Sequence, residues 1–183
     1  MMYRCLIANR GEIAVRIIRA CRELNIETVA IYAKGDENSL HVSLADQAIC
    51  IGEANPLDSY LNIDRIISAA KVTESNVIHP GYGFLSESTN FAKAVEDNHI
   101  HFIGPSKTTM EMMGDKITAR QTVKQAGVPV IPGSNDAVQS VDEIKLLSKE
   151  IGFPVVLKAA SGGGGKGIRI VKEASHLDQA LKE

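Results

Sequence analysis

Residues 153–171 read Phe153-Pro154-Val155-Val156-Leu157-Lys158-Ala159-Ala160-Ser161-Gly162-Gly163-Gly164-Gly165-Lys166-Gly167-Ile168-Arg169-Ile170-Val171. The apolar runs on either side of the glycines are rich in Val and Ile and too short for helices, so they predict two strands joined by a hairpin. Consecutive glycines let several backbone N–H groups approach one anion, because no Cβ blocks them. With Lys158 before the glycines and Lys166 after them, we interpret the hairpin as a flap over nucleotide phosphates. A surface hairpin without a ligand is the alternative.

Three better-known glycine motifs do not fit this stretch. The run 162–167 spells G-x-G-x-x-G, but a dinucleotide fingerprint opens a helix, whereas a strand is expected over 168–171. A P-loop would require glycine where Ala160 stands. In protein kinases the lysine lies on a later strand, whereas Lys158 precedes the glycines.

The composition is that of an ordinary globular protein. The 183 residues are 44% hydrophobic and 23% charged, and the net charge of −2 predicts no general attraction to nucleic acid or to a membrane. No apolar stretch approaches the length of a membrane span, and the first residues do not resemble a secretion signal. Cys5, Cys21 and Cys50 have no metal-binding spacing and are expected to be buried, reduced thiols. These features predict a cytoplasmic protein.

Strand and helix signals alternate along the first hundred residues. This order predicts an α/β fold, with βαβ units forming a mostly parallel sheet that has helices on both faces. On the first helix, an apolar stripe of Ile13, Ile17, Ala20, Cys21 and Leu24 is expected to face the core. Strands are expected over 3–8, 28–32, 47–51, 76–78 and 100–103, and helices over 11–24, 61–70 and 91–96.

Two unusual loops follow strands of this predicted sheet. Asn9-Arg10-Gly11-Glu12 comes after the first strand, and His79-Pro80-Gly81-Tyr82-Gly83-Phe84-Leu85-Ser86-Glu87 comes after the fourth. Ligands of parallel sheets bind at the carboxyl ends of the strands, so both loops are candidates for a site. Turn formation and aromatic packing are the alternatives for the second loop. For Asn9 and Arg10, helix capping and a surface ion pair compete with ligand contact.

The composition changes near Gly104-Pro105, and the later segment 127–133 is expected to lead into a second unit. Helical segments are predicted over 106–127, with an interruption at 114–116 and with Ser106 and Asp115 as N-caps. A strand or linker is expected over 127–133, a helix over 141–150, and another helix from an N-cap at Ser175. That last helix has no stop signal, which predicts that the chain is a fragment. Met110, Met112 and Met113 are interpreted as core residues.

Four ordered motifs carry a resemblance to a known family. They are Ile7-Ala8-Asn9-Arg10-Gly11-Glu12-Ile13-Ala14, the run His79–Glu87, Met113-Gly114-Asp115-Lys116, and Lys158 with its glycine flap. Together they closely resemble biotin carboxylases, the components of biotin-dependent carboxylases that carry the ATP chemistry. The resemblance covers essentially the whole chain. It implies a Rossmann-like pre-ATP-grasp domain over 1–114 and the beginning of an ATP-grasp domain over 115–183.

The resemblance also implies an activity and its site. In this family ATP phosphorylates bicarbonate, and the activated carboxyl group passes to biotin on a carrier protein. The implied cofactors are ATP and Mg²⁺, with the metal ligands and catalytic residues expected beyond Glu183. A substrate-side loop is implied at His79, Tyr82, Gly83 and Glu87. The residues implied to bind ATP are Lys116, Lys158, Gly163, Gly164, Gly165 and Lys166.

Partners follow from the same resemblance. They are bicarbonate, a biotin carboxyl carrier protein, a carboxyltransferase component and a second copy of the chain, contacted through Arg16, Arg19 and Glu23. A solvated charged helix face is the alternative for these three residues. The best match within the family serves bacterial acetyl-CoA carboxylase, in fatty acid synthesis; pyruvate carboxylase or another acyl-CoA carboxylase is the alternative. A carbamoyl-phosphate synthetase and a non-catalytic scaffold are the competing classes.

Overall fold

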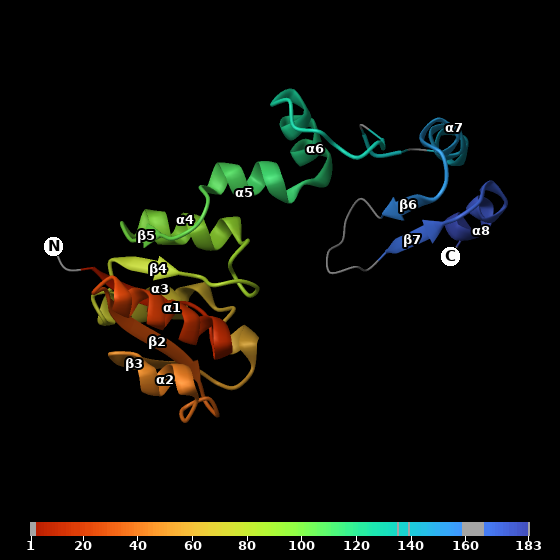
Figure 1. The fold of residues 1–183 in the computed structure, drawn as a ribbon. Helices are drawn as coiled ribbons and strands as arrows, with labels where there is room; N and C mark the ends of the chain where they lie inside the picture. Colours follow the sequence, from red (N-terminus) through yellow and green to blue (C-terminus); the bar gives the residue numbers. More distant parts are fainter. Residues whose placement is uncertain (1–2, 135, 139, 159–166, 183) are drawn as a thin grey trace. The chain divides into compact units, whose positions relative to one another are not determined.

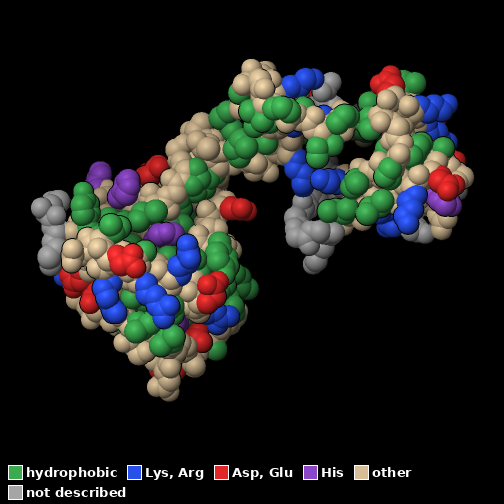
Figure 2. Space-filling model, in the orientation of Figure 1, with side chains coloured by type: hydrophobic (Ala, Val, Ile, Leu, Met, Phe, Trp, Pro, Cys, Tyr) green, Lys and Arg blue, Asp and Glu red, His purple; other side chains and the backbone are tan. Residues whose placement is uncertain are grey.

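The computed structural model describes residues 3–134, 136–138, 140–158 and 167–182. The chain divides into two compact units, Met1–Glu111 and Met112–Glu183. The division falls inside helix α5 (Lys107–Gly114), whereas the resemblance placed it after Gly114. On the visible face of the first unit, acidic and basic side chains are interspersed (Figure 2).

The first unit is built on a five-stranded sheet with the order β3-β2-β1-β4-β5 (Figure 1). All four neighbouring pairs run parallel, as the alternation of strands and helices predicted. The elements of this unit are β1 (Arg4–Ile7), α1 (Gly11–Glu23), β2 (Glu27–Ala33), α2 (Leu40–Leu44), β3 (Gln47–Gly52), the 3₁₀ helix Pro56–Asp58, α3 (Ile63–Val72), β4 (Val77–His79), α4 (Thr89–Asp97) and β5 (His101–Phe102).

Helices cover both faces of this sheet, as expected. On one face, Leu6 and Ile31 pack in a core that includes Ile66 of α3 and Phe91 of α4. The other face carries a smaller core that includes Cys5, Ile7 and residues of α1. Residues 5–7 of β1 are all buried, because this central strand is covered from both sides.

The predicted stripe of α1 is correct only in part. Ile17 and Cys21 are buried, but Ala20 is exposed and Leu24 is 69% exposed. The buried face also includes Ala14, Val15 and Ile18. Leu24 lies past the end of α1, where Asn25 has a φ of 56° that ends the helix. The buried face of α1 is therefore centred closer to residues 14 and 18 than predicted.

Two further predictions of burial are wrong. Cys50 is exposed, because β3 is an edge strand and only Ile51 of its six residues is fully buried. Met110 is buried, but Met112 and Met113 are 39% and 50% exposed. The sequence analysis also missed α2, a helix of five residues that is too short to show a helical period.

The second unit contains an antiparallel hairpin and several helices. Strands β6 (Val155–Lys158) and β7 (Ile168–Val171) pair as the flanks of the glycine run predicted. Val155 and Val171 pack against Leu177 in the core of this unit. Ser175 is not an N-cap, since it lies inside the 3₁₀ helix Ala174–His176 that precedes α8. The helices of this unit are α6 (Lys116–Gln125), α7 (Val141–Ile151) and α8 (Leu177–Lys182).

Candidate functional site

The two loops singled out in the sequence are joined by the side chain of Asn9. Its amide nitrogen donates hydrogen bonds of 2.8 Å to the carbonyl oxygens of Pro80 and Tyr82. The two loops meet because β1 and β4 are neighbours in the parallel sheet, so their carboxyl ends lie at the same edge. Asn9 is 4% exposed, and its amide satisfies the carbonyl groups of Pro80 and Tyr82, which lie outside helices and strands.

Gly81 allows this contact because it has no side chain. A Cβ at position 81 would lie 2.8 Å from Nδ2 of Asn9, and the φ of Gly81 is +67°. Gly83 has the same φ but faces open space. The first glycine is therefore required by close approach as well as by conformation, and the second by conformation alone.

Arg10 forms a surface ion pair and not a cap. It occupies the N-cap position of α1 without a side-chain capping bond, so the structure favours the ion pair over capping among the alternatives left open for Arg10. Its Nη1 lies 3.1 Å from Oδ2 of Asp36, and its guanidinium lies over the rings of Tyr60 and Phe84. Burial alone would raise the pKa of Asp36, but hydrogen bonds from Tyr60 and Arg10 outweigh it and lower this pKa.

A hollow of about 350 Å³ lies between these loops, lined by residues 9–13 and 82–84. Tyr82 is 60% exposed, and its phenol donates a hydrogen bond to the carboxylate of Glu12. Tyr82 and Gly83 therefore line a hollow at the carboxyl edge of the sheet. This is the part of the predicted substrate-side loop that the structure brings together with the first loop.

His79 and Glu87, the other two residues of that prediction, are placed differently. Nδ1 of His79 accepts a hydrogen bond of 3.0 Å from the backbone N–H of Gly81, so the imidazole shapes the turn. Burial lowers the pKa of His79, which favours the neutral ring that this acceptor role needs. Glu87 is exposed and comes directly before Ser88, the N-cap residue of α4.

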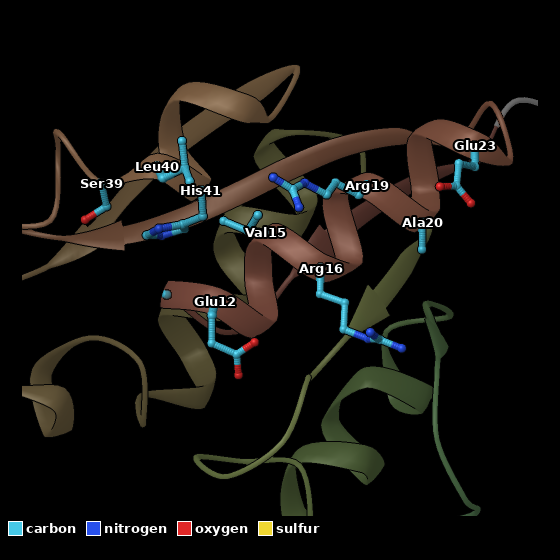
Figure 3. A pocket seen from close by; sticks show the side chains of 10 residues that line it. Glu12, Val15, Arg16, Arg19, Ala20, Glu23, Ser39, Leu40 and His41 are labelled. Atoms are coloured by element: carbon cyan, nitrogen blue, oxygen red, sulfur yellow. The ribbon is translucent and has the colours of Figure 1, made fainter.

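A larger groove of about 850 Å³ runs between α1 and the start of α2 (Figure 3). The predicted contact residues Arg16, Arg19 and Glu23 all line it from α1, and Ser39, Leu40 and His41 line it from the other side. His41 is 1% exposed, and burial lowers its pKa. The structure thus gathers the three charged residues of the predicted self-association surface in one groove.

In the second unit, Lys158 lies at the end of β6 and shares one face of the hairpin with apolar side chains. Val156 pairs with Ile170, and Lys158 pairs with Ile168, so these four residues lie on the same side. All four are exposed, with Val156, Ile168 and Ile170 at 50%, 47% and 67%. The opposite face is the one that packs on the core of this unit. The sequence did not predict this apolar face, because residues 155–157 are all apolar and show no alternation that would separate the two faces of the strand.

Lys116 is the first residue of α6, and Asp115 caps this helix as predicted. Oδ1 of Asp115 accepts a hydrogen bond of 2.8 Å from the N–H of Thr118, and this bond is the main reason that the pKa of Asp115 is lowered. Lys116 and Lys158 belong to the same unit but to different elements. Gly163, Gly164, Gly165 and Lys166, the other residues predicted to bind ATP, lie outside the described residues.

Over the described part of the chain, no group of three or more His, Cys, Asp or Glu residues could hold a metal ion. Among those same residues, no helix is long and apolar enough to cross a membrane.

Comparison with known proteins identifies the family. Residues 1–110 match the family model described as "Biotin carboxylase, N-terminal domain", and residues 115–183 match "Carbamoyl-phosphate synthase L chain, ATP binding domain". The chain belongs to the biotin carboxylase family, as the four motifs predicted.

Two relatives show how far the similarity extends. Biotin carboxylase 1 of Bacillus subtilis is 53% identical over 182 residues, which is 100% of this chain and 40% of that protein. Biotin carboxylase of Pseudomonas aeruginosa is 48% identical over 183 residues, which is 100% of this chain and 41% of that protein. The chain therefore spans about two fifths of the length of these relatives.

Solved structures agree with the fold. A biotin carboxylase of Campylobacter jejuni, in a complex described as β,γ-ATP, has a TM-score of 0.91 at 47% identity, covering 100% of this chain and 41% of that one. The biotin carboxylase domain dimer of the Hydrogenobacter thermophilus 2-oxoglutarate carboxylase, with MgADP, ADP and bicarbonate, has a TM-score of 0.88 at 49% identity. This match covers 100% of the present chain and 40% of the 2-oxoglutarate carboxylase chain.

Proposed function

We propose that the chain is the N-terminal portion of an ATP-dependent ligase that uses bicarbonate to carboxylate biotin on a carrier protein. Family membership supports this proposal, as does the relative whose structure contains MgADP and bicarbonate. ATP would phosphorylate bicarbonate, and the activated carboxyl group would pass to a nitrogen of biotin. With two fifths of the relatives' length, the 183-residue chain alone is expected not to turn over.

The observation that carries the nucleotide part of the proposal is the exposed face of β6 and β7. Lys158 presents an ammonium group beside Val156, Ile168 and Ile170 on the same face. A nucleotide needs both features, because its base binds to apolar surface and its phosphates bind to cations. We place the base on the three apolar side chains and the phosphates toward Lys158, with Lys116 and the segment 163–166 as further phosphate contacts.

The acceptor side of the proposal rests on the paired loops of the first unit. The hollow between them offers the exposed ring of Tyr82 and the backbone of Gly83. We propose this hollow as the biotin side of the site, with His79 shaping the turn. A role for Glu87 in the complete protein stays a prediction.

The metal part of the proposal has no support in the described residues. Mg²⁺ bound to nucleotide phosphates would neutralise charge that develops in phosphoryl transfer. Because the described residues contain no cluster that could hold the ion, we propose that its ligands lie in other parts of the complete protein.

We further propose that the groove between α1 and α2 is a contact between two copies of the complete protein. Arg16, Arg19 and Glu23 line it with both signs of charge, which allows a symmetric pair of copies to place opposite charges together. The domain of the 2-oxoglutarate carboxylase is described as a dimer, which supports the idea.

The final acceptor is the least constrained part. We propose acetyl-CoA carboxylase, and hence fatty acid synthesis, with a biotin carboxyl carrier protein and a carboxyltransferase as partners and a cytoplasmic location. A carboxylase with another acceptor is the alternative, because a 2-oxoglutarate carboxylase small subunit is 51% identical to the chain and the biotin carboxylase subunit of a pyruvate carboxylase is 52% identical.

One experiment tests the proposal as a whole. The complete protein that carries this chain should hydrolyse ATP only when bicarbonate and free biotin are both present. Turnover without biotin would favour a carbamoyl-phosphate synthetase, the class whose ATP-binding model matches residues 115–183. Bicarbonate-dependent turnover by the 183 residues alone would contradict the expectation for the fragment.

The nucleotide face has its own test in the complete protein. Ile170→Ser should weaken ATP binding by about threefold to tenfold, because a base loses apolar contact at an exposed position. Leu146→Ser on α7 is the matched control, since Leu146 is 62% exposed but lies off this face. Equal affinities for wild type and Ile170→Ser would remove the apolar face from the proposal.

A further inference from the structure

Arg10 is held by groups from three other segments of the first unit. Its Nη1 lies 3.1 Å from Oδ2 of Asp36, in the turn after β2. Its Cζ lies 5.1 Å from the ring centroid of Tyr60 and 5.7 Å from that of Phe84. Both distances are within the range of cation–π attraction. A side chain with three partners is fixed in place even though it is partly exposed.

Two of these partners, Tyr60 and Asp36, are themselves fixed by hydrogen bonds. Tyr60 is fully buried, donates a hydrogen bond of 2.6 Å to Asp36, and accepts one of 3.0 Å from the N–H of Ala33. Tyr60 and Asp36 therefore hold one another and are tied to the end of β2. Two of the three partners of the guanidinium are therefore fixed outside the loop Pro80–Phe84.

The third partner, Phe84, belongs to the substrate-side loop and is conformationally strained. Its φ is +41°, which a residue with a side chain seldom adopts. Its ring stacks on that of Tyr60 with centroids 5.2 Å apart and an interplanar angle of 2°. The backbone alone disfavours this conformation, and the ring contacts with Tyr60 and Arg10 favour it. Phe84 and Arg10 line the hollow together with Tyr82 and Gly83.

We propose that Arg10 is a positioning residue, which acts through Phe84 to hold the loop Pro80–Phe84 in the shape that receives the biotin acceptor. The inference rests on the proposed function for the identity of the acceptor, but the conformational part does not depend on it. Asn9 holds the backbone of the same loop through the carbonyl groups of Pro80 and Tyr82. Arg10 holds the loop through the side chain of Phe84.

Steady-state kinetics of the complete protein with free biotin as the probe test the proposal. Arg10→Ala should raise the KM for biotin by about tenfold to hundredfold, because a small displacement of a binding loop has effects of this size. The KM for ATP should stay within about twofold, since the ATP residues are proposed in the other unit. Arg10→Lys should recover only part of the effect, because an ammonium group can pair with Asp36 but cannot lie flat on the rings. Lys34→Ala is the matched control, as it breaks another ion pair of the first unit, with Glu53, for which the described residues show no ring contact.

A double-mutant cycle separates action through Phe84 from direct contact with the acceptor. If Arg10 acts through Phe84, Phe84→Leu should raise the KM for biotin similarly, and the double variant should be no worse than the more impaired single variant. The proposal would be overturned if the effects of the two substitutions on the KM for biotin multiplied in the double variant. It would also be overturned if Arg10→Ala raised the KM for ATP as much as the KM for biotin, or left the KM for biotin at the wild-type value.

Amide hydrogen exchange provides a readout that is independent of the reaction. Exchange within residues 80–86 should be faster in Arg10→Ala than in wild type, whereas exchange in β1 and β4 should be unchanged. If the wild-type protein shows no biotin-dependent turnover, the proposed function fails, and this measurement still decides the conformational role. Unchanged exchange over 80–86 in Arg10→Ala would overturn that role.

Discussion

The Cα of Gly81 faces the side chain of Asn9 so closely that a Cβ at position 81 would lie 2.8 Å from its Nδ2. The two residues come from loops that follow β1 and β4, and their contact closes one side of the candidate acceptor site. Packing at this distance leaves no room for the methyl group of alanine.

Gly81→Ala should therefore destabilise the protein more than Gly83→Ala. Both glycines have a φ of +67°, so each substitution carries a conformational penalty of about 1–2 kcal/mol. Only position 81 adds a clash, worth about 1–3 kcal/mol more. Urea unfolding of the two variants measures the difference. Equal free energies of unfolding would show that Asn9 can move aside without loss.

Asn9→Asp should be more harmful than Asn9→Ala. The amide of Asn9 donates to two carbonyl oxygens, whereas a carboxylate can donate to neither and would face both with its charge. Losing buried hydrogen bonds should cost about 2–4 kcal/mol for alanine, with more lost for aspartate. Asn98→Ala removes a single local bond to Ala94 and serves as the control in the same unfolding experiment. A stable Asn9→Asp variant would contradict the donor assignment.

His41 should make stability depend on pH. Its Nε2 lies 3.2 Å from the carbonyl oxygen of Ile31, and its Nδ1 is buried without a partner among the described residues. Burial holds the pKa of His41 in the folded state below the ordinary value of about 6.5, although Asp36 acts in the opposite direction. The unfolded chain then binds more protons, so stability is fully present above about pH 6.5 and falls as the pH drops through that value.

The comparison with His41→Gln isolates this effect, because the amide of glutamine can still donate to Ile31 but does not titrate. The free energy of unfolding of the wild type, relative to that of the variant, should decrease below pH 6.5 by at most about 1.4 kcal/mol per pH unit. Parallel pH profiles for the two proteins would refute the assignment of a buried neutral imidazole.

Lys158→Ala and Lys116→Ala should each weaken ATP use by the complete protein by about tenfold to hundredfold, corresponding to a lost charge-assisted contact of about 1.5–3 kcal/mol. Lys172→Ala, at an exposed position just past β7, should have little effect. Steady-state KM and kcat for ATP measure the change. Wild-type values in both lysine variants would remove these residues as phosphate contacts.

Arg19→Glu should disrupt self-association of the complete protein, if the groove between α1 and α2 is the contact. Reversing a charge that lines the groove places like charges opposite one another, which should raise the dissociation constant by at least about tenfold. Arg19→Lys keeps the sign of the charge and is the control. Analytical ultracentrifugation would contradict the groove as the contact if Arg19→Glu still formed dimers like those of the wild type.

Much of this fold follows from local sequence. The order of strands and helices, the parallel sheet and the hairpin around the glycines were predicted because apolar periods and turn residues report secondary structure directly. The family followed from four short motifs for the same reason: each is contiguous. The errors are at positions where neighbours in space decide burial, such as Cys50 on an edge strand and Leu24 past the end of α1.

The sequence by itself identified Asn9, Arg10, Lys158 and the loop His79–Glu87 as candidate site residues. Only the tertiary structure decided what Asn9 and Arg10 do. Their partners, Pro80, Tyr82, Asp36, Tyr60 and Phe84, lie between 26 and 74 positions away along the chain. A hydrogen bond or a ring contact depends on distances of a few ångströms between atoms. Strand order brings such atoms together, and no local pattern of residues specifies which distant side chains will meet.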